Sequence, residues 1–295
     1  MVRRAIIITG CQRSGTNLVN LILDSHPQIR GFDEMSLFHW EVIQPLMAAE
    51  EGREVTAEDG LALMTVDDRI AAHLADPQHP PYVAFQLPPY ASKIAYLKSL
   101  RPAMRILWCL RDPRDVVTSM LKLGLPFTRS EIVPWAVHPA AEFEIDQALR
   151  QLSEQVRQAL SNHLELYEIV RQKSPRVRTR YDGVLMGALC WRIKNELLAV
   201  YEREQLPFSV IRYEELIRDP QQQIEKVLAD LDLPWHETVL RHHELHRGLV
   251  SGETDSARPI DATNTAKWRA VLSNEELEVV HKVTSGLALQ LGYFH

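Results

Sequence analysis

The amino-acid sequence predicts an α/β protein built on a doubly wound parallel sheet that is flanked by helices and carries helical insertions. Two observations predict this fold. Short, almost continuously apolar runs alternate with longer segments of helical pattern, as expected when strands are covered on both faces. The first run also passes through a glycine-containing turn into a helix, which is the order found at the ligand-binding edge of parallel sheets.

Each predicted element follows from such a run or pattern. The predicted strands cover residues 5–9, 82–86, 105–110 and 208–212. A short helix follows the first turn and ends before Pro27, because proline cannot continue a helix. The longer predicted helices, each long enough for a crossover or an inserted bundle, cover residues 92–100, 114–123, 144–171, 185–204 and 220–230.

Length, charge and cysteine content limit the class of protein. A chain of 295 residues, 45% of them hydrophobic, is expected to form a single domain over residues 1–295. The net charge of −6 gives no overall positive field, so we expect no nucleic-acid partner. Three cysteines without a C-x-x-C pair indicate neither a disulfide framework nor a zinc site. With no signal or transmembrane segment in view, we expect a cytoplasmic protein; the sequence does not predict its oligomeric state.

The turn after the first strand has the composition of a phosphate-binding loop. Residues 10–17 read Gly-Cys-Gln-Arg-Ser-Gly-Thr-Asn and match the P-loop spacing as far as the second glycine. Thr16 then stands where the lysine of a P-loop would be, and Asn17 where the Mg²⁺-binding hydroxyl would be. We therefore expect this P-loop-like turn to bind a polyphosphate through backbone N–H groups and Arg13, without a metal.

A second strand-to-helix junction follows at residues 110–119, Leu-Arg-Asp-Pro-Arg-Asp-Val-Val-Thr-Ser. Asp112 is a suitable N-cap, and Pro113 fits the first helical turn. Arg111 and Ser119 can then approach one anion from two sides, although a capped helix with surface ion pairs is the alternative. Two anion sites at one edge of the sheet suggest a ligand that is phosphorylated at two separated places.

Four further segments are less specific. Tyr213 ends the fourth strand and could stack on a base, and residues 264–269 offer cations and an indole after a Gly/Ser/Asp-rich stretch. Residues 248–263 are a possible mobile loop. Residues 125–143 form either a lid or a buried structural loop, with Phe127 and Trp135 indicated as exposed. The alternating arginines of residues 174–183 indicate either a substrate-contacting strand or a solvated linker.

In this order and spacing, these motifs resemble the sulfotransferases that use 3′-phosphoadenosine 5′-phosphosulfate (PAPS). The N-terminal half, from Arg13-Ser14-Gly15-Thr16 to Glu34, is most similar to tyrosylprotein and related Golgi-type enzymes and their bacterial relatives. The resemblance implies PAPS as donor, its desulfated form PAP as product, and no metal. It also implies a donor site made of Gln12, Arg13, Ser14, Gly15, Thr16 and Asn17 for the 5′-phosphosulfate, Arg111 and Ser119 for the 3′-phosphate, Tyr213 beside the adenine, and Lys267 with Trp268 returning toward the donor.

The same resemblance suggests the catalytic residues. Glu34 lies at the offset from Arg13 where tyrosylprotein enzymes carry their catalytic glutamate, so it is the predicted general base, with His39 and His26 in reserve. Arg13 is the predicted stabiliser of the transferred group. Gln86 stands where many relatives have a lysine, so the missing charge would come from Arg13, Lys267 or Lys93.

Three functions remain open from the sequence. The first is transfer of a sulfuryl group to a hydroxyl of a small molecule, glycan, lipid or peptide tyrosine. The alternatives are a P-loop small-molecule kinase and a catalytically impaired nucleotide-binding protein. A metal site is not expected at residues 242–246, His-His-Glu-Leu-His, because the spacing is not H-E-x-x-H and a polar surface helix explains the pattern.

Overall fold

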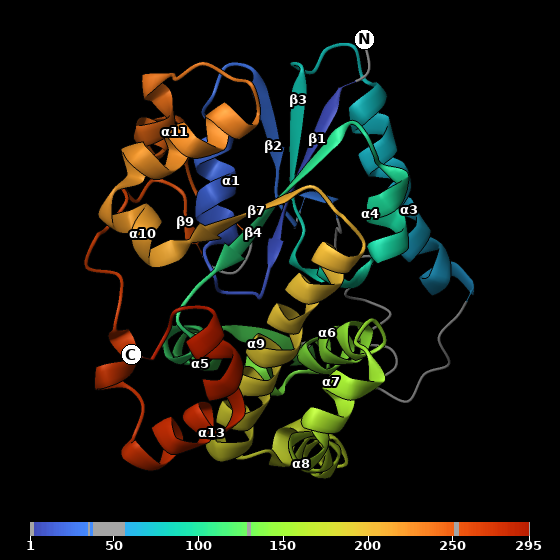
Figure 1. Ribbon diagram of the computed structural model, residues 1–295, viewed down its shortest axis with the longest axis vertical. Coiled ribbons are helices and arrows are strands. Elements are labelled where there is room, and N and C mark those ends of the chain that lie inside the picture. Colours follow the sequence, from blue (N-terminus) through green and yellow to red (C-terminus); the bar gives the residue numbers. More distant parts are fainter. Residues whose placement is uncertain (1–2, 35, 38–56, 129–130, 251–253, 295) are drawn as a thin grey trace.

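The computed structural model contains a five-stranded sheet, and all of its strands run parallel (Figure 1). The structure describes all residues except 1–2, 35, 38–56, 129–130, 251–253 and 295. The strand order is β2-β3-β1-β4-β7. The strands are β1 (Arg4–Gly10), β2 (Ile29–Phe32), β3 (Tyr82–Gln86), β4 (Met104–Leu110) and β7 (Phe208–Arg212). The predicted parallel α/β fold is confirmed, and β2 is a strand that the prediction lacked.

The side chains of β1 alternate between two hydrophobic cores, one on each face of the sheet. Ile7 belongs to the larger core, whereas Ile6 and Ile8 belong to the smaller one on the other face. All three are completely buried. This two-sided burial explains why β1 reads as a continuous apolar run instead of an alternating one.

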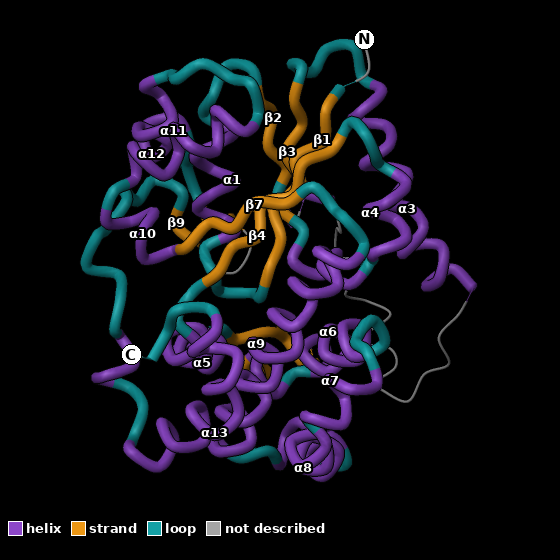
Figure 2. Tube along the Cα trace, viewed as in Figure 1, coloured by secondary structure: helices purple, strands orange, loops and turns teal. Residues whose placement is uncertain are grey.

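Helices cover both faces of the sheet (Figure 1). The smaller core lies under α1, α10 and α11, and the larger one under α3, α4, α5, α9 and α13. A helical layer with α5, α6, α7, α8, α9 and α13 lies beyond the lower end of the sheet in Figure 2. The α-helices are α1 (Thr16–Asp24), α3 (Ala57–Ala75), α4 (Ile94–Ser99), α5 (Pro113–Lys122), α6 (Pro139–Leu149), α7 (Glu154–Ala159), α8 (Ser161–Arg171), α9 (Arg180–Arg203), α10 (Tyr213–Arg218), α11 (Pro220–Asp230), α12 (His242–Leu245) and α13 (Asn274–Gln290).

Two predicted segments differ in detail from the structure. The helix expected over residues 144–171 is the three helices α6, α7 and α8, because Ser153 caps a new helix and breaks the run. Residues 125–143 contain most of an antiparallel hairpin, β5 (Gly124–Thr128) with β6 (Glu131–Pro134), followed by the start of α6. Phe127 and Trp135 are buried, so the prediction that they are exposed was wrong.

The arginines of residues 174–183 have structural partners. Arg178 forms an ion pair with Glu142, and its side chain is 1% exposed. Arg176 pairs with Glu131, and Arg180 pairs with Glu276. The segment therefore ties α6, β6 and α13 to the start of α9, which neither of the two predicted alternatives described. Among the described helices, none has the length and apolar character to cross a bilayer.

Candidate functional site

The turns that follow β1, β4 and β7 meet at one edge of the sheet. The turn after β1 is very close to its neighbours: a Cβ on Gly10 would lie 2.4 Å from the carbonyl oxygen of Cys109, and one on Gly15 would lie 2.5 Å from the Tyr213 ring. Both glycines also have positive φ, 131° and 94°. Glycine is required at these positions because a side chain would separate the turn from β4 and α10.

The two predicted anion sites form one cluster. Arg13 Nε donates a hydrogen bond to Ser119 Oγ at 2.9 Å, and Arg111 Nη1 donates to the Arg13 carbonyl oxygen at 3.1 Å. Asp112 caps α5 by accepting from the Arg114 N–H, as predicted. The cluster thus joins the turn after β1 to the first two turns of α5.

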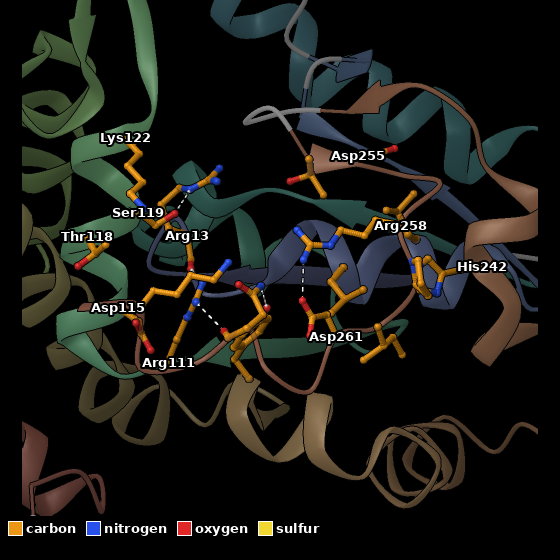
Figure 3. A pocket seen from close by; sticks show the side chains of 18 residues that line it. Arg13, Arg111, Asp115, Thr118, Ser119, Lys122, His242, Asp255, Arg258 and Asp261 are labelled. Atoms are coloured by element: carbon orange, nitrogen blue, oxygen red, sulfur yellow. Dashed lines mark hydrogen bonds and ion pairs between the residues drawn. The ribbon is translucent and has the colours of Figure 1, made fainter. Parts of the chain in front are cut away.

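A cavity of about 320 Å³ opens from this cluster (Figure 3). Five cationic and three acidic side chains line it, which gives a local excess of positive charge although the whole chain has a net charge of −6. At one end lie Arg13, Ser119 and Lys122, and His242 lies at the other (Figure 3). The lining residues are Arg13, Leu18, Leu21, Arg111, Asp115, Thr118, Ser119, Lys122, Tyr213, His242, Thr254, Asp255, Arg258, Pro259, Ile260, Asp261, Asn264 and Lys267.

The electrostatics at Lys267 agree with an anion site. Burial lowers the pKa of its ammonium group, and the positive charges of Arg258, Arg111 and Lys122 lower it further, against an opposing effect of Asp261. Cations held this close together repel one another, so binding of a polyanion would relieve the repulsion. Lys267 lines the cavity together with these cations, and its role toward the donor stays a prediction.

Tyr213 is held between the two anion-binding segments. Its ring packs on Gly15, and the Arg111 guanidinium lies over the ring at 4.2 Å. Asn264 donates a hydrogen bond to its hydroxyl group and accepts one from Arg111 Nη2 through the backbone carbonyl at 3.2 Å. These contacts place Tyr213 in the cavity wall.

Asp115 holds the segment that carries Lys267. Its carboxylate accepts hydrogen bonds from the backbone N–H groups of Ala266 at 2.7 Å and Trp268 at 3.2 Å. Trp268 itself is 9% exposed, and its ring packs against the guanidinium of Arg114 at 4.3 Å. The structure therefore brings Lys267 to the cavity and places the Trp268 ring in the hydrophobic core instead.

Gln86 joins the predicted base to the turn after β1. Its Nε2 donates to Thr16 Oγ1 at 3.1 Å, and its Oε1 accepts from the backbone N–H of Glu34 at 2.9 Å. Gln86 is 2% exposed, so the connection is buried. One amide thus fixes the distance between α1 and Glu34, whose side chain is half-buried.

Lys194 is a site residue that the sequence analysis missed. Its ammonium group, on α9, forms an ion pair with Glu144 and donates to Gln12 Oε1 at 3.0 Å and to the Pro88 carbonyl at 2.8 Å. Burial lowers its pKa, but the Glu144 carboxylate outweighs that effect and the pKa is raised. A lysine in an apolar stripe of α9 was the available signal, because such a charge needs a buried partner.

The remaining candidates differ in their position relative to the cavity. His39 falls outside the described residues. His26 is structural, because Nε2 contacts the Pro234 carbonyl and Nδ1 accepts from the Gln28 N–H. Lys93 pairs with Asp67. Ser14 is buried, and Asn17 donates to Thr254 across the cavity rim.

His242 corrects the prediction of a polar surface helix at residues 242–246. Its side chain is completely buried, and only four residues are helical. The hydroxyl of Ser25 contacts His246 Nε2 at 3.1 Å, so this segment packs on α1. Within the residues that can be described, no group of three or more His, Cys, Asp or Glu could hold a metal ion.

The burial of His242 predicts a pH dependence of folding stability. Burial, followed by His243, lowers its pKa to about 4 from 6.5. Between these values the unfolded chain binds a proton that the native state does not, so stability falls as pH drops from about 6.5 to 4. The loss reaches about 3 kcal/mol at pH 4. Urea unfolding of His242→Phe should show a shallower pH slope than the parent; parallel slopes would contradict the assignment.

Known proteins share sequence and fold with this chain. A model of the sulfotransferase family matches residues 5–237. Protein-tyrosine sulfotransferase 2 of Gallus gallus is 24% identical over 98% of this chain, and protein-tyrosine sulfotransferase 1 of Danio rerio is 24% identical over 89%. These matches cover 69% and 65% of the two relatives, about two thirds of their length.

Two solved structures share the fold. The sulfotransferase domain from the Synechococcus PCC 7002 olefin synthase superposes with a TM-score of 0.53 and 16% identity, covering 95% of this chain and 94% of that one. The sulfotransferase domain from the curacin biosynthetic pathway gives 0.52 and 16%, covering 100% and 99%. At this identity the similarity is evidence of the fold.

Proposed function

We propose, from the premise that this chain belongs to the sulfotransferase family, that its sulfuryl-transfer reaction uses PAPS as the donor and releases PAP. The observation that carries the proposal is the cluster of Arg13, Ser119 and Arg111 at the rim of one cavity. Cations from two separate strand-to-helix turns suit a donor with phosphate groups at two places. A single triphosphate chain would not need both turns.

Unsatisfied polar atoms in this site support a missing ligand. Within the described part of the chain, Arg111 Nε, Thr118 Oγ1 and Ser14 Oγ are buried without a hydrogen-bond partner. Such atoms are costly unless a ligand or water satisfies them. Arg111 and Thr118 line the cavity, so they are suited to the 3′-phosphate, whereas Ser14 lies in the turn proposed for the 5′-phosphosulfate.

Different residues of this chain are proposed for different parts of the transfer reaction. PAPS, when bound, supplies the activated sulfuryl group. Arg13 and the backbone N–H groups of the turn are placed to stabilise negative charge on the departing 5′-phosphate. Glu34 is proposed to accept the proton of the acceptor hydroxyl. Gln86 positions Glu34 relative to α1, and it brings no charge to the leaving group.

Lys194 contacts the turn after β1 from within the core, where it is paired with Glu144. It binds the Gln12 side chain and the Pro88 carbonyl, two residues beyond Gln86. We propose that it orients the Gln12 amide, whose buried Nε2 has no partner within the described residues and is available to the donor. Because Lys194 is neutralised by Glu144, this arrangement would supply a hydrogen-bond donor, and not the charge, of the lysine that many relatives carry at the position of Gln86.

The acceptor is proposed at the level of a hydroxyl group. A peptide tyrosine is the first acceptor to test, because the curated relatives are named protein-tyrosine sulfotransferases. Small-molecule phenols, glycans and lipids form the remainder of the panel. Location in the cytoplasm stays a prediction from the sequence.

Transfer of radiolabelled sulfate from PAPS to this panel, with and without a chelator, tests the function. We expect transfer that the chelator does not abolish. Arg111→Ala should weaken PAP binding, measured by calorimetry, at least tenfold, because a charge-assisted contact is lost. The control is Arg114→Ala, since Arg114 pairs with Asp112 and lies outside the cavity lining. Equal losses in the two variants would argue against a 3′-phosphate site at Arg111.

A further inference from the structure

The cavity that opens from the anion cluster also has apolar lining. Leu18 and Leu21 of α1 contribute to it, together with Pro259 and Ile260 of the segment before Lys267. His242 lies at the end opposite the anion cluster, beyond the Arg258–Asp261 ion pair (Figure 3). Apolar side chains and a polar ring that line the same cavity suit a flat ligand group with apolar faces and a polar edge.

The hydrogen-bonding capacity of His242 is only partly used. The ring is completely buried, and within the described residues neither ring nitrogen makes a hydrogen bond of normal geometry, although the Arg258 backbone acts on the ring as an acceptor. The neighbouring His243 packs edge-on against it, with ring centroids 5.6 Å apart, which limits its rotation. A buried polar group that is incompletely paired is unfavourable, so a ligand that pairs with it would gain affinity.

The protonation state of His242 determines which hydrogen-bonding groups of a ligand can pair with it. The pKa of His242 is lowered to about 4, mainly by burial and next by His243, so the imidazole is neutral at physiological pH. A neutral imidazole carries one donor nitrogen and one acceptor nitrogen. Its acceptor nitrogen can accept a hydrogen bond from an exocyclic amine, and its N–H can donate one to a ring nitrogen.

We propose that His242 recognises the polar edge of the nucleobase in the donor nucleotide and makes the site selective for a base with an exocyclic amine. This inference rests on the proposed use of PAPS. The apolar walls would cover the faces of the base while the cationic end binds the phosphates. The base specificity of this protein would therefore depend on a residue far along the chain from the phosphate-binding turns.

Calorimetric binding of two nucleotides tests the proposal. The probes are PAP and purine riboside 3′,5′-bisphosphate, which lacks the 6-amino group. The parent protein should bind PAP about tenfold more tightly than the purine analogue. His242→Phe should weaken PAP binding about five- to tenfold and change analogue binding less than twofold, because the lost contact is the one the analogue cannot make.

The matched control is His243→Phe, the same substitution one residue along the chain and outside the cavity lining. It should keep the parent's preference for PAP. If His242→Phe does not fold, judged by circular dichroism, His242→Gln serves instead and should retain part of the preference through its amide. Equal weakening of both nucleotides, or a parent protein without preference, would overturn the role of His242.

Failure of the donor assignment gives a different result. A protein that binds neither nucleotide and transfers no sulfate from PAPS refutes the proposed function together with this inference. A protein that transfers sulfate from PAPS and binds both nucleotides equally refutes the inference alone.

Discussion

Replacement of Lys194 by methionine is expected to lower the free energy of unfolding by about 3–5 kcal/mol. The ammonium group is 2% exposed and neutralises the buried Glu144 carboxylate while donating to Gln12 and Pro88. Methionine fills a similar volume but leaves a buried charge without a partner. Urea unfolding followed by circular dichroism measures the loss.

Two controls separate charge from packing in this experiment. Lys194→Met combined with Glu144→Leu should recover more than half of the loss, because the uncompensated carboxylate is removed. Lys98→Met breaks a more exposed ion pair, with Glu204 at 2.7 Å, and should cost less than about 1 kcal/mol. A loss in Lys194→Met no larger than that of Lys98→Met would show that Lys194 does not support the turn after β1.

Glu34→Gln is expected to reduce turnover by roughly 10²-fold or more and to leave PAP affinity unchanged. The amide has nearly the same shape as the carboxylate but cannot take the proton of the acceptor hydroxyl. Glu34 lies outside the residues that line the cavity, and its backbone bond to Gln86 does not depend on the side chain. Radiolabelled sulfate transfer and calorimetry measure the two quantities.

Asp33→Asn is the matched control for Glu34. Asp33 is the residue before Glu34, and its carboxylate accepts a hydrogen bond from the Ser36 N–H. The change therefore removes a nearby carboxylate whose contact is structural. It should leave turnover within about threefold of the parent. Activity retained by Glu34→Gln would assign proton transfer to another group.

Local sequence patterns were sufficient where one segment contains its own signal. The run of Ile6, Ile7 and Ile8 predicted a doubly covered strand. The turn after β1 carried its glycines and Arg13 within a few positions, and the turn after β4 carried Arg111 next to the N-cap Asp112. The strand β2 escaped prediction, because its four residues include Arg30 and Gly31 and gain their structure by pairing with β3.

No single segment of the sequence indicates which distant residues it will contact in the folded chain. Trp268 and Lys267 are neighbours in sequence, yet the Asp115 carboxylate fixes their backbone so that the lysine borders the cavity and the indole enters the core. The sequence analysis had assigned both residues to the donor site. Lys194 and His242 likewise become functional candidates only through their burial.

The sequence by itself determined the parallel α/β fold and the family, through the order of local motifs along the chain, and the two turns whose cations and N–H groups attract phosphate, because each of these motifs lies within one short segment. Tertiary structure decided which of the remaining side chains join them. Three features connect distant segments of the chain. Lys194 pairs with Gln12, Gln86 pairs with Glu34, and His242 lies at the far end of the cavity (Figure 3). Burial of these polar groups is unfavourable unless they pair, and pairs between groups distant in sequence form only after the chain has folded.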